Sequence, residues 1–169
     1  MSIKSCCFTG HRPKALPWKN DESDIRCAAL KSKIRFTVEN LIVEHGCVNF
    51  ISGMAQGSDM ICAEVILALK NIYPDIKLEC AIPNYAFTEK WSAEDVRRYS
   101  SILTRADNIN FISEKKVYSV SDLMLRNIYM VDRSDFIVAV YKDGETGGTR
   151  NTLNYAESKD KTIIIISPG

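Results

Sequence analysis

The sequence predicts a single α/β domain of three layers, in which helices cover both faces of a mainly parallel sheet of about six strands. Two observations support this fold class. Short apolar runs alternate with helical patterns along the whole chain, as is typical of parallel sheets covered by helices. Three of these runs end in turns rich in glycine and other small residues. At 169 residues and 46% hydrophobic content, we expect residues 1–169 to share one core.

The alternation sets the expected bounds of each element. Apolar runs bounded by turn residues predict strands, and apolar positions that recur every three or four residues predict helices. The expected strands cover residues 3–9, 47–52, 76–82, 108–112, 135–141 and 162–167. The expected helices cover residues 23–45, 57–71, 89–105, 119–133 and 148–159.

The first two helical patterns differ in their expected burial. The first keeps helical spacing from Ile25 to Ile42 and ends at His45 and Gly46, where a histidine cation suits a helix C-terminus. The second is apolar nearly all round from Met60 onward, so we expect it to be the most buried helix.

The fourth helical pattern begins with Ser119 and Asp122 in a capping-box arrangement. We expect Asp122 and Arg126, four residues apart, to pair on its surface, and Asn127 to lie beside its apolar stripe. The expected stripe consists of Val120, Met124, Ile128 and Val131.

The order of the strands follows from the connections between them. Crossovers between parallel strands are right-handed in nearly all folds, which places the first strand between the second and the fifth. The turns after these strands then meet at the carboxyl edge of the sheet, where open α/β sheets bind ligands. We therefore expect Gly10, Gly53 and Gly148 to surround one crevice that binds phosphate.

The first turn, Thr9 to Pro13, has a single glycine, and no acidic residue ends the second strand to hold a ribose. A conventional hydride-transfer cofactor is therefore disfavoured. Gly10 lets backbone N–H groups approach an anion, Arg12 suits a phosphate, and His11 can donate a hydrogen bond or transfer a proton. The alternative is a plain turn with a surface Arg12 and a His11 that the backbone satisfies.

The second turn is more specific, because it joins a strand to the most buried helix. Small residues here leave several backbone N–H groups directed at whatever lies above the helix N-terminus. Asp59 either compensates the helix dipole or accepts hydrogen bonds from a ribose or a base. The binding candidates in this turn are Ser52, Gly53, Gln56, Gly57, Ser58 and Asp59.

The third turn is Gly147-Gly148-Thr149, which follows the strand at 135–141 and opens the last helix. Its glycines permit close backbone approach to a ligand, and the Thr149 hydroxyl can cap the helix or bind phosphate.

Net charge and cysteine content indicate which classes of protein this chain can belong to. The 22 basic and 21 acidic residues are mixed along the chain and give a net charge of +1, without the basic footprint of a general nucleic-acid binder. The N-terminus has no cleavable apolar run, and no stretch approaches the roughly 18 apolar residues of a membrane span. We expect a soluble cytoplasmic protein whose six cysteines are reduced core thiols, with no metal site.

Taken together, these segments resemble the SLOG superfamily, and most of all its YpsA/YoqJ branch, over nearly the whole chain. The resemblance implies a Rossmann-like domain that binds a nucleotide or nucleotide-derived small molecule, often in signalling or biological conflict. It implies no required cofactor, and it makes a homodimer an expected assembly. The motifs that carry it are Phe8-Thr-Gly-His-Arg-Pro13, Ser52-Gly-Met-Ala-Gln-Gly-Ser-Asp59, Trp91, Arg126-Asn127, Met130-Val-Asp132, Gly147-Gly-Thr149 and Asn154-Tyr-Ala156.

An alternative function is N-glycoside hydrolysis, because the LOG phosphoribohydrolases of this superfamily cleave nucleoside monophosphates. Those enzymes have an Arg before the fifth strand, which Arg126 matches, and a Glu soon after the glycine-rich turn. Here no carboxylate follows Thr149 closely, which removes the usual partner of an oxocarbenium-like transition state. The catalytic candidates under this hypothesis are Asp59, Arg126 and Glu145.

A further alternative is a DprA-like module that binds single-stranded DNA or another macromolecule. Residues 83–117, a candidate lid or rim, carry the aromatic and basic side chains for stacking and phosphate contacts. The near-zero net charge weighs against this alternative, so we expect a small-molecule partner rather than nucleic acid or a membrane. The residues concerned are Trp91, Arg97, Arg98 and Tyr99.

Overall fold

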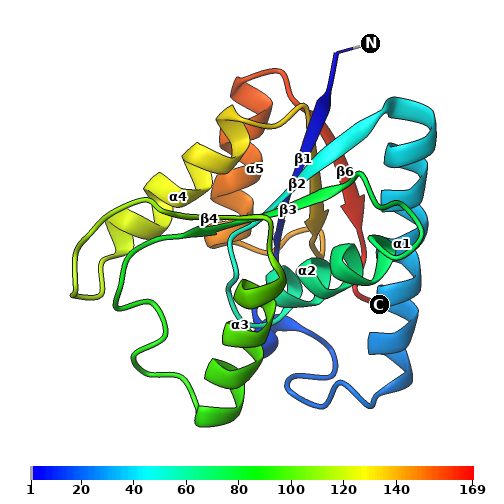
Figure 1. Cartoon of the computed structure of the whole chain (residues 1–169). Helices are drawn as coiled ribbons and strands as arrows, with labels where there is room; N and C mark the ends of the chain where they lie inside the picture. Colours follow the sequence, from blue (N-terminus) through cyan, green and yellow to red (C-terminus); the bar gives the residue numbers. More distant parts are fainter. Residues whose placement is uncertain (1) are drawn as a thin grey trace.

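A computed structural model describes residues 2–169 and contains one fully parallel sheet with the strand order β4-β3-β2-β1-β5-β6 (Figure 1). β1 lies between β2 and β5, as the crossover rule predicts. The strands are β1 (Lys4–Gly10), β2 (Cys47–Ser52), β3 (Lys77–Ile82), β4 (Asn108–Phe111), β5 (Phe136–Val140) and β6 (Thr162–Ile166).

The helices follow the predicted order, with starts set by capping residues. The α-helices are α1 (Ile25–His45), α2 (Ser58–Leu69), α3 (Ala93–Arg105), α4 (Val120–Asp132) and α5 (Gly148–Ser158), and a 3-10 turn η1 spans Pro13–Ala15. α1 and α3 begin later than predicted, because Asp24 and Ser92 accept hydrogen bonds from the first turn of each helix. Residues 83–117, the candidate lid or rim, contain α3 and β4, and both elements were predicted.

Helices cover both faces of the sheet and form the expected three layers (Figure 1). Neighbouring residues of β1 show the division. Cys6 belongs to the large core that α1 and α2 build, whereas Cys7 packs with Met130 of α4 and Ala156 of α5 on the opposite face. α2 is buried along nearly its whole length, which confirms the prediction from its apolar sequence.

The orientation of α4 differs from the prediction. Val120 and Met124, two members of the expected apolar stripe, are 61% and 55% exposed, whereas Asp122 and Arg126 are buried. The expected surface pair is also wrong, because Asp122 accepts a hydrogen bond from Asn84 Nδ2 at 2.9 Å. Polar partners on other elements therefore decide which side of this helix faces inward, and Asp122 and Arg126 have such partners.

The six cysteines are free and buried, as predicted. Burial raises the pKa of the Cys7, Cys47 and Cys80 thiols to about 12, so these side chains pack as neutral apolar groups. Within the described residues, no helix combines the length and apolar character needed to cross a bilayer.

Gly10 lies where β1 ends against the start of α2, and no larger side chain fits there. A Cβ atom at this position would lie 2.6 Å from Ser58 Cβ and 2.9 Å from Val140 Cβ. Because both neighbours are buried, neither can move away without disturbing the core. The absence of a side chain lets the three elements meet.

We predict that Gly10→Ala destabilises the protein by about 1–3 kcal/mol, because overpacking a filled core displaces its neighbours. Gly148→Ala is the matched control, since a Cβ there meets no atom within 4 Å. Urea denaturation of both variants measures the difference. Equal midpoints for the two variants would contradict the close packing at Gly10.

Candidate functional site

The turns after β1, β2 and β5 meet at the carboxyl edge of the sheet and line a cavity of about 340 Å³, which we call the first cavity. The inner side of α4 completes its wall. Gly10 and Gly148 line this cavity as expected, but Gly53 does not. The lining residues are Thr9, Gly10, His11, Arg12, Ala55, Asp59, Val120, Leu123, Arg126, Asn127, Thr146, Gly148, Thr149 and Asn151.

Hydrogen bonds of His11 connect the first turn to the other two turns. Its N–H donates to the Val140 carbonyl at 3.0 Å, and its carbonyl accepts from the Ser58 N–H at 3.2 Å and the Ser58 hydroxyl at 2.7 Å. Its imidazole Nε2 accepts from the Lys142 backbone N–H at 2.9 Å, so the neutral ring carries its proton on Nδ1. Burial lowers the pKa of His11, although the Glu145 carboxylate opposes the shift. Of the two roles left open by the sequence, the structure shows the histidine that the backbone satisfies.

Three amides of the second turn donate within the protein, whereas the sequence predicted that they point toward a ligand. The N–H of Met54 donates to Ser52 Oγ at 3.2 Å, and the N–H of Ala55 donates to Asp59 Oδ2 at 3.2 Å. The N–H of Ser58 donates to the first turn at 3.2 Å. Small residues permit this tight turn, and these three donors are not free to bind a phosphate.

Three predicted binding residues of the second turn lie behind the wall of the first cavity and do not line it. Ser52 is fully buried and Ser58 is 1% exposed. A Cβ at Gly53 would lie 2.7 Å from Arg126 Nη1, and the Gly53 carbonyl accepts a hydrogen bond from that nitrogen. Ser52, Gly53 and Ser58 therefore hold the site together without facing it.

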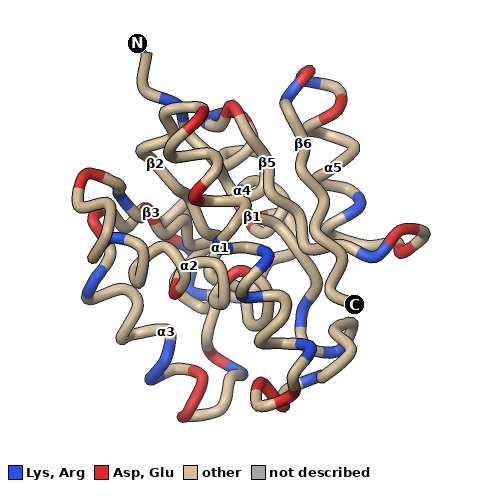
Figure 2. Tube along the Cα trace, turned by 90° about the vertical axis from the view of Figure 1, so that its right-hand side faces the viewer, with Lys and Arg blue, Asp and Glu red and all other residues tan. Residues whose placement is uncertain are grey.

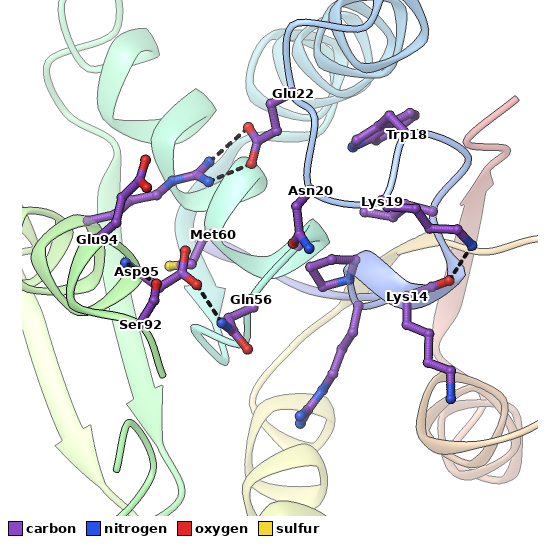
Figure 3. Close-up of a pocket in the computed structure, with 15 residues that line it drawn as sticks. Lys14, Trp18, Lys19, Asn20, Glu22, Gln56, Met60, Ser92, Glu94 and Asp95 are labelled. Atoms are coloured by element: carbon purple, nitrogen blue, oxygen red, sulfur yellow. Dashed lines mark hydrogen bonds and ion pairs between the residues drawn. The ribbon is translucent and has the colours of Figure 1, made fainter. Parts of the chain in front are cut away.

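Gln56 and Gly57 face a different cavity, of about 900 Å³, which we call the second cavity (Figure 3). This cavity lies between residues 12–22, the turn before α2 and the start of α3. Gln56 Nε2 donates to Asp95 Oδ2 at 2.7 Å and so connects the turn to α3. Arg12 lines both cavities.

Arg126 is the central cation of the first cavity. It is 4% exposed, and two of its five N–H groups are used: Nη1 donates to the Gly53 carbonyl and Nε donates to Asn127 Oδ1 at 2.9 Å. Among residues 2–169, no carboxylate forms an ion pair with it. Burial lowers the pKa of Arg126 to about 10, opposed by the charge of Asp59 and assisted by that of Arg12.

Asp59 is the only carboxylate among the residues that line the first cavity. It is 6% exposed, and Oδ2 accepts from the Ala55 N–H. Burial raises the pKa of Asp59, whereas the charge of Arg126, the Ala55 hydrogen bond and the charge of Arg12 lower it. The first cavity thus holds two buried groups, a cation and a carboxyl, without a direct ion pair between them.

The N-terminus of α5 opens into the first cavity through Gly148 and Thr149. The predicted cap by Thr149 is wrong: the N-cap residue is Gly147, and no side chain bonds to the first turn. The positive end of the helix dipole and the orphan amides of this turn therefore face the cavity. Gly147 itself lies outside the lining.

For two further residues, the prediction and the structure differ. Glu145, a predicted catalytic candidate, is exposed and does not line the first cavity. Asn151 was not predicted, although it lines the cavity from the first turn of α5. It lies three residues after Gly148, on the same face of the helix, so helical spacing was the signal that could have identified it.

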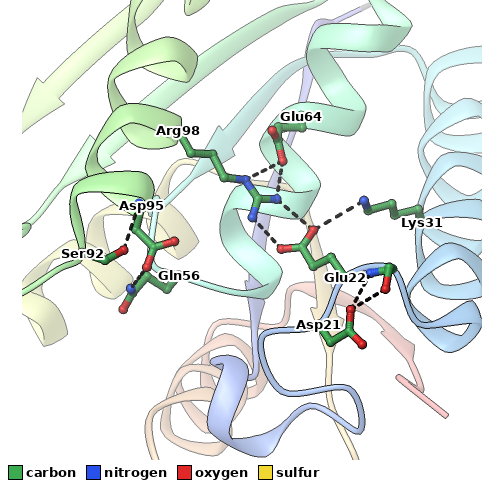
Figure 4. Close-up of polar contacts among 9 residues, drawn as sticks. Asp21, Glu22, Lys31, Gln56, Glu64, Ser92, Asp95 and Arg98 are labelled. Atoms are coloured by element: carbon green, nitrogen blue, oxygen red, sulfur yellow. Dashed lines mark hydrogen bonds and ion pairs between the residues drawn. The ribbon is translucent and has the colours of Figure 1, made fainter.

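The aromatic and basic cluster proposed for single-stranded DNA is not an open stacking surface. Tyr99 is 8% exposed, and Trp91 packs edge-on against Tyr99 and Phe87. Arg98 binds Glu22 and Glu64, so its charge is already neutralised (Figure 4). Basic and acidic residues are interspersed along the chain trace (Figure 2).

Comparison with known proteins identifies the family of this chain. Residues 6–168 match the family described as the YspA SLOG family, whose short name is YpsA. The chain belongs to this SLOG family. SLOG proteins similar to it include the SPbeta prophage-derived protein YoqJ of Bacillus subtilis (strain 168), 38% identical over 138 residues that cover 76% of this chain and 80% of YoqJ. A UPF0398 protein of Bacillus thuringiensis (strain Al Hakam) is 28% identical over 158 residues, covering 93% of this chain and 84% of the relative.

A solved structure shares the fold of this SLOG chain. DNA processing protein A from Helicobacter pylori superposes with a TM-score of 0.64 at 17% sequence identity, over 96% of this chain and 64% of that one. The present chain thus spans less than two thirds of that protein, which was described for its single-stranded DNA binding mode. The resemblance inferred from the sequence motifs is confirmed at the level of family and fold.

We predict that His11 makes the stability of the protein fall with acidification. Folded His11 has a lowered pKa, so the unfolded chain binds more protons, and stability is lost as pH falls from about 6.5 through the folded pKa. In His11→Gln, the side-chain oxygen can accept from Lys142 without titrating. Urea denaturation between pH 8 and pH 5 should show a steeper loss for the native protein than for the variant. Parallel curves would contradict this role of His11.

Proposed function

We propose that this SLOG protein binds a nucleotide or nucleotide-derived small molecule in the first cavity, with a phosphate beside Arg126. The observation that carries the proposal is the buried guanidinium of Arg126, which forms no ion pair among residues 2–169. A buried cation without an ionic partner is costly, and an anionic ligand that pairs with it removes this cost.

The other groups of the first cavity match the parts of such a ligand. Arg12 is exposed at its rim, and the amides at Gly148 and Thr149 present a helix N-terminus to an anion. Asp59 and Asn127 supply acceptors and amide donors suited to a ribose. A cavity of about 340 Å³ lies within the usual range for small-molecule sites.

One observation favours a second candidate function, N-glycoside hydrolysis. Asp59 is a buried carboxyl that lies in the same cavity as Arg126. In such a reaction Arg126 would hold the phosphate and ionised Asp59 would stabilise the positive charge that develops on the sugar. Glu145 has no comparable place, because it lies outside the first cavity.

Binding of single-stranded DNA, described for the Helicobacter pylori structure, is the remaining alternative. Only Arg12 and Arg126 are basic among the residues of the first cavity, and Trp91 of the proposed stacking cluster packs against Phe87 and Tyr99. A phosphate-backbone site releases counterions and weakens steeply with salt. A salt titration of oligonucleotide affinity therefore tests this alternative, and a flat response removes its basis.

We predict that Arg126→Gln weakens the binding of adenosine monophosphate about 10- to 100-fold, because each charge-assisted phosphate contact contributes roughly 1.5–3 kcal/mol. Isothermal titration calorimetry measures the change. Arg133→Gln is the matched control on the same helix, since Arg133 is exposed and its guanidinium lies 3.8 Å from the centre of the Tyr129 ring, outside the cavity.

Because Arg126 also supports Gly53, its replacement changes the packing behind the cavity. Arg12→Gln provides a second variant, as the exposed Arg12 side chain forms no ion pair among residues 2–169. Arg12→Gln should also weaken the binding of the nucleotide, by about tenfold for one lost phosphate contact. Unchanged affinity in both variants would show that phosphate does not bind in the first cavity.

We predict that the hydrolase alternative, if correct, depends on Asp59. Incubation with nucleoside monophosphates should then release free base, and Asp59→Asn should abolish release while Glu145→Gln leaves it intact. Chromatography of the products measures both. Ligand-induced thermal stabilisation without base release supports a binding protein instead.

A further inference from the structure

The second cavity has no role in the binding of phosphate at Arg126, yet it is the larger of the two at about 900 Å³. Its floor is apolar, formed by Leu16, Trp18 and Met60, each at most 4% exposed. Polar and charged side chains surround this floor (Figure 3). An apolar floor with a few polar groups at its edges is typical of a site for a small organic ligand.

Trp18 contributes an observation that packing does not explain. Among residues 2–169, its indole Nε1 is the only buried side-chain nitrogen or oxygen without a hydrogen-bond partner. The nitrogen lies at the end of the ring that is turned toward Asn20 (Figure 3). A buried donor without an acceptor destabilises the folded protein, and an acceptor on a ligand would satisfy it.

The opposite side of the second cavity presents acceptors. Asp95 and Glu94 come from the first turn of α3, and Gln56 Nε2 already donates to Asp95 Oδ2 (Figure 3). Gln56 Oε1, the second oxygen of Asp95 and the Glu94 carboxylate are therefore available to accept hydrogen bonds. Glu94 forms no ion pair with any of residues 2–169.

The nearby cation does not neutralise these acceptors. Arg98 donates from Nε to Glu64 at 3.0 Å and from Nη2 to Glu22 at 3.1 Å, and Lys31 lies 3.4 Å from Glu22 (Figure 4). This network fixes residues 18–24 against α1, α2 and α3, so the wall that carries Trp18 is held in place. The second cavity thus has a donor on one side and acceptors on the other, separated by an apolar floor.

Arg12 connects the two cavities, because it lines both of them. The turn before α2 does the same, with Ala55 in the first cavity and Gln56 and Gly57 in the second. A ligand whose phosphate lies beside Arg12 can therefore reach into either cavity. Lys14 and Lys19 add positive charge on the Trp18 side of the second cavity (Figure 3).

We infer that the second cavity is a base-recognition site that selects nucleobases bearing an exocyclic amino group, an inference that rests on the proposed binding of a nucleotide. The base occupies the second cavity, and the Trp18 N–H donates to a ring nitrogen or carbonyl. The amino group donates to Asp95 and Gln56 Oε1. A carbonyl in place of the amino group meets these acceptors with its own lone pairs, so hypoxanthine and uracil are rejected.

The test compares nucleotides that differ only in this group. By calorimetry, adenosine monophosphate should bind at least about tenfold more tightly than inosine monophosphate, and cytidine monophosphate more tightly than uridine monophosphate. Asp95→Asn should reduce the preference for adenosine over inosine monophosphate by about tenfold. Asp75→Asn, an exposed position before β3, is the matched control and should leave the preference intact.

Trp18→Phe keeps an aromatic ring and removes the N–H. Trp18→Phe should weaken the binding of adenosine monophosphate about tenfold and leave the affinity for ribose 5-phosphate unchanged. Trp91→Phe should change neither affinity. Equal affinities of the native protein for the adenine and hypoxanthine nucleotides overturn the inference. If Arg126→Gln then still weakens the binding of both nucleotides, the proposal for the first cavity stands and only base selection fails. If no nucleotide and no ribose phosphate binds the native protein, both fail.

Discussion

The hydrogen bonds of His11 are the constraint on which the rest of the site depends. Three chain segments far apart in sequence end at the same edge of the sheet. The backbone of His11 binds the end of β5 and the start of α2, and its ring binds the turn after β5. Gly10 allows these contacts because it has no side chain to separate the elements. Fixing this junction fixes the walls of both cavities.

Several groups at this junction are held at a cost in stability. Arg126 and Asp59 are buried without a direct ion pair, and the N-terminus of α5 has no side-chain cap. Interactions of this kind are unfavourable in an empty protein and become favourable when a ligand supplies the missing partner. α4 contributes by turning Arg126 inward, which leaves Val120 and Met124 in solvent.

Family membership and fold agree with this interpretation without deciding it. The match to the YspA SLOG family covers residues 6–168, which includes every turn discussed above. The Helicobacter pylori protein shares the fold. A shared fold leaves the ligand open, because function depends on the side chains at that edge. In this chain they form two cavities joined at Arg12.

The sequence by itself determined the strands, their order and the meeting of three turns at one edge. Local apolar periodicity and the handedness of crossovers decide these features, and both can be recognised in short segments such as Phe136–Val140. Only the tertiary structure decided that the amides of Met54 and Ala55 are used internally, that Arg126 is buried, and that Trp18 lines a second cavity. The amides of Met54 and Ala55 bond to side chains two and four residues away, in a turn whose geometry the spacing alone does not reveal. Arg126 instead bonds to Gly53, 73 residues away, and no local pattern encodes which donor meets which acceptor after folding.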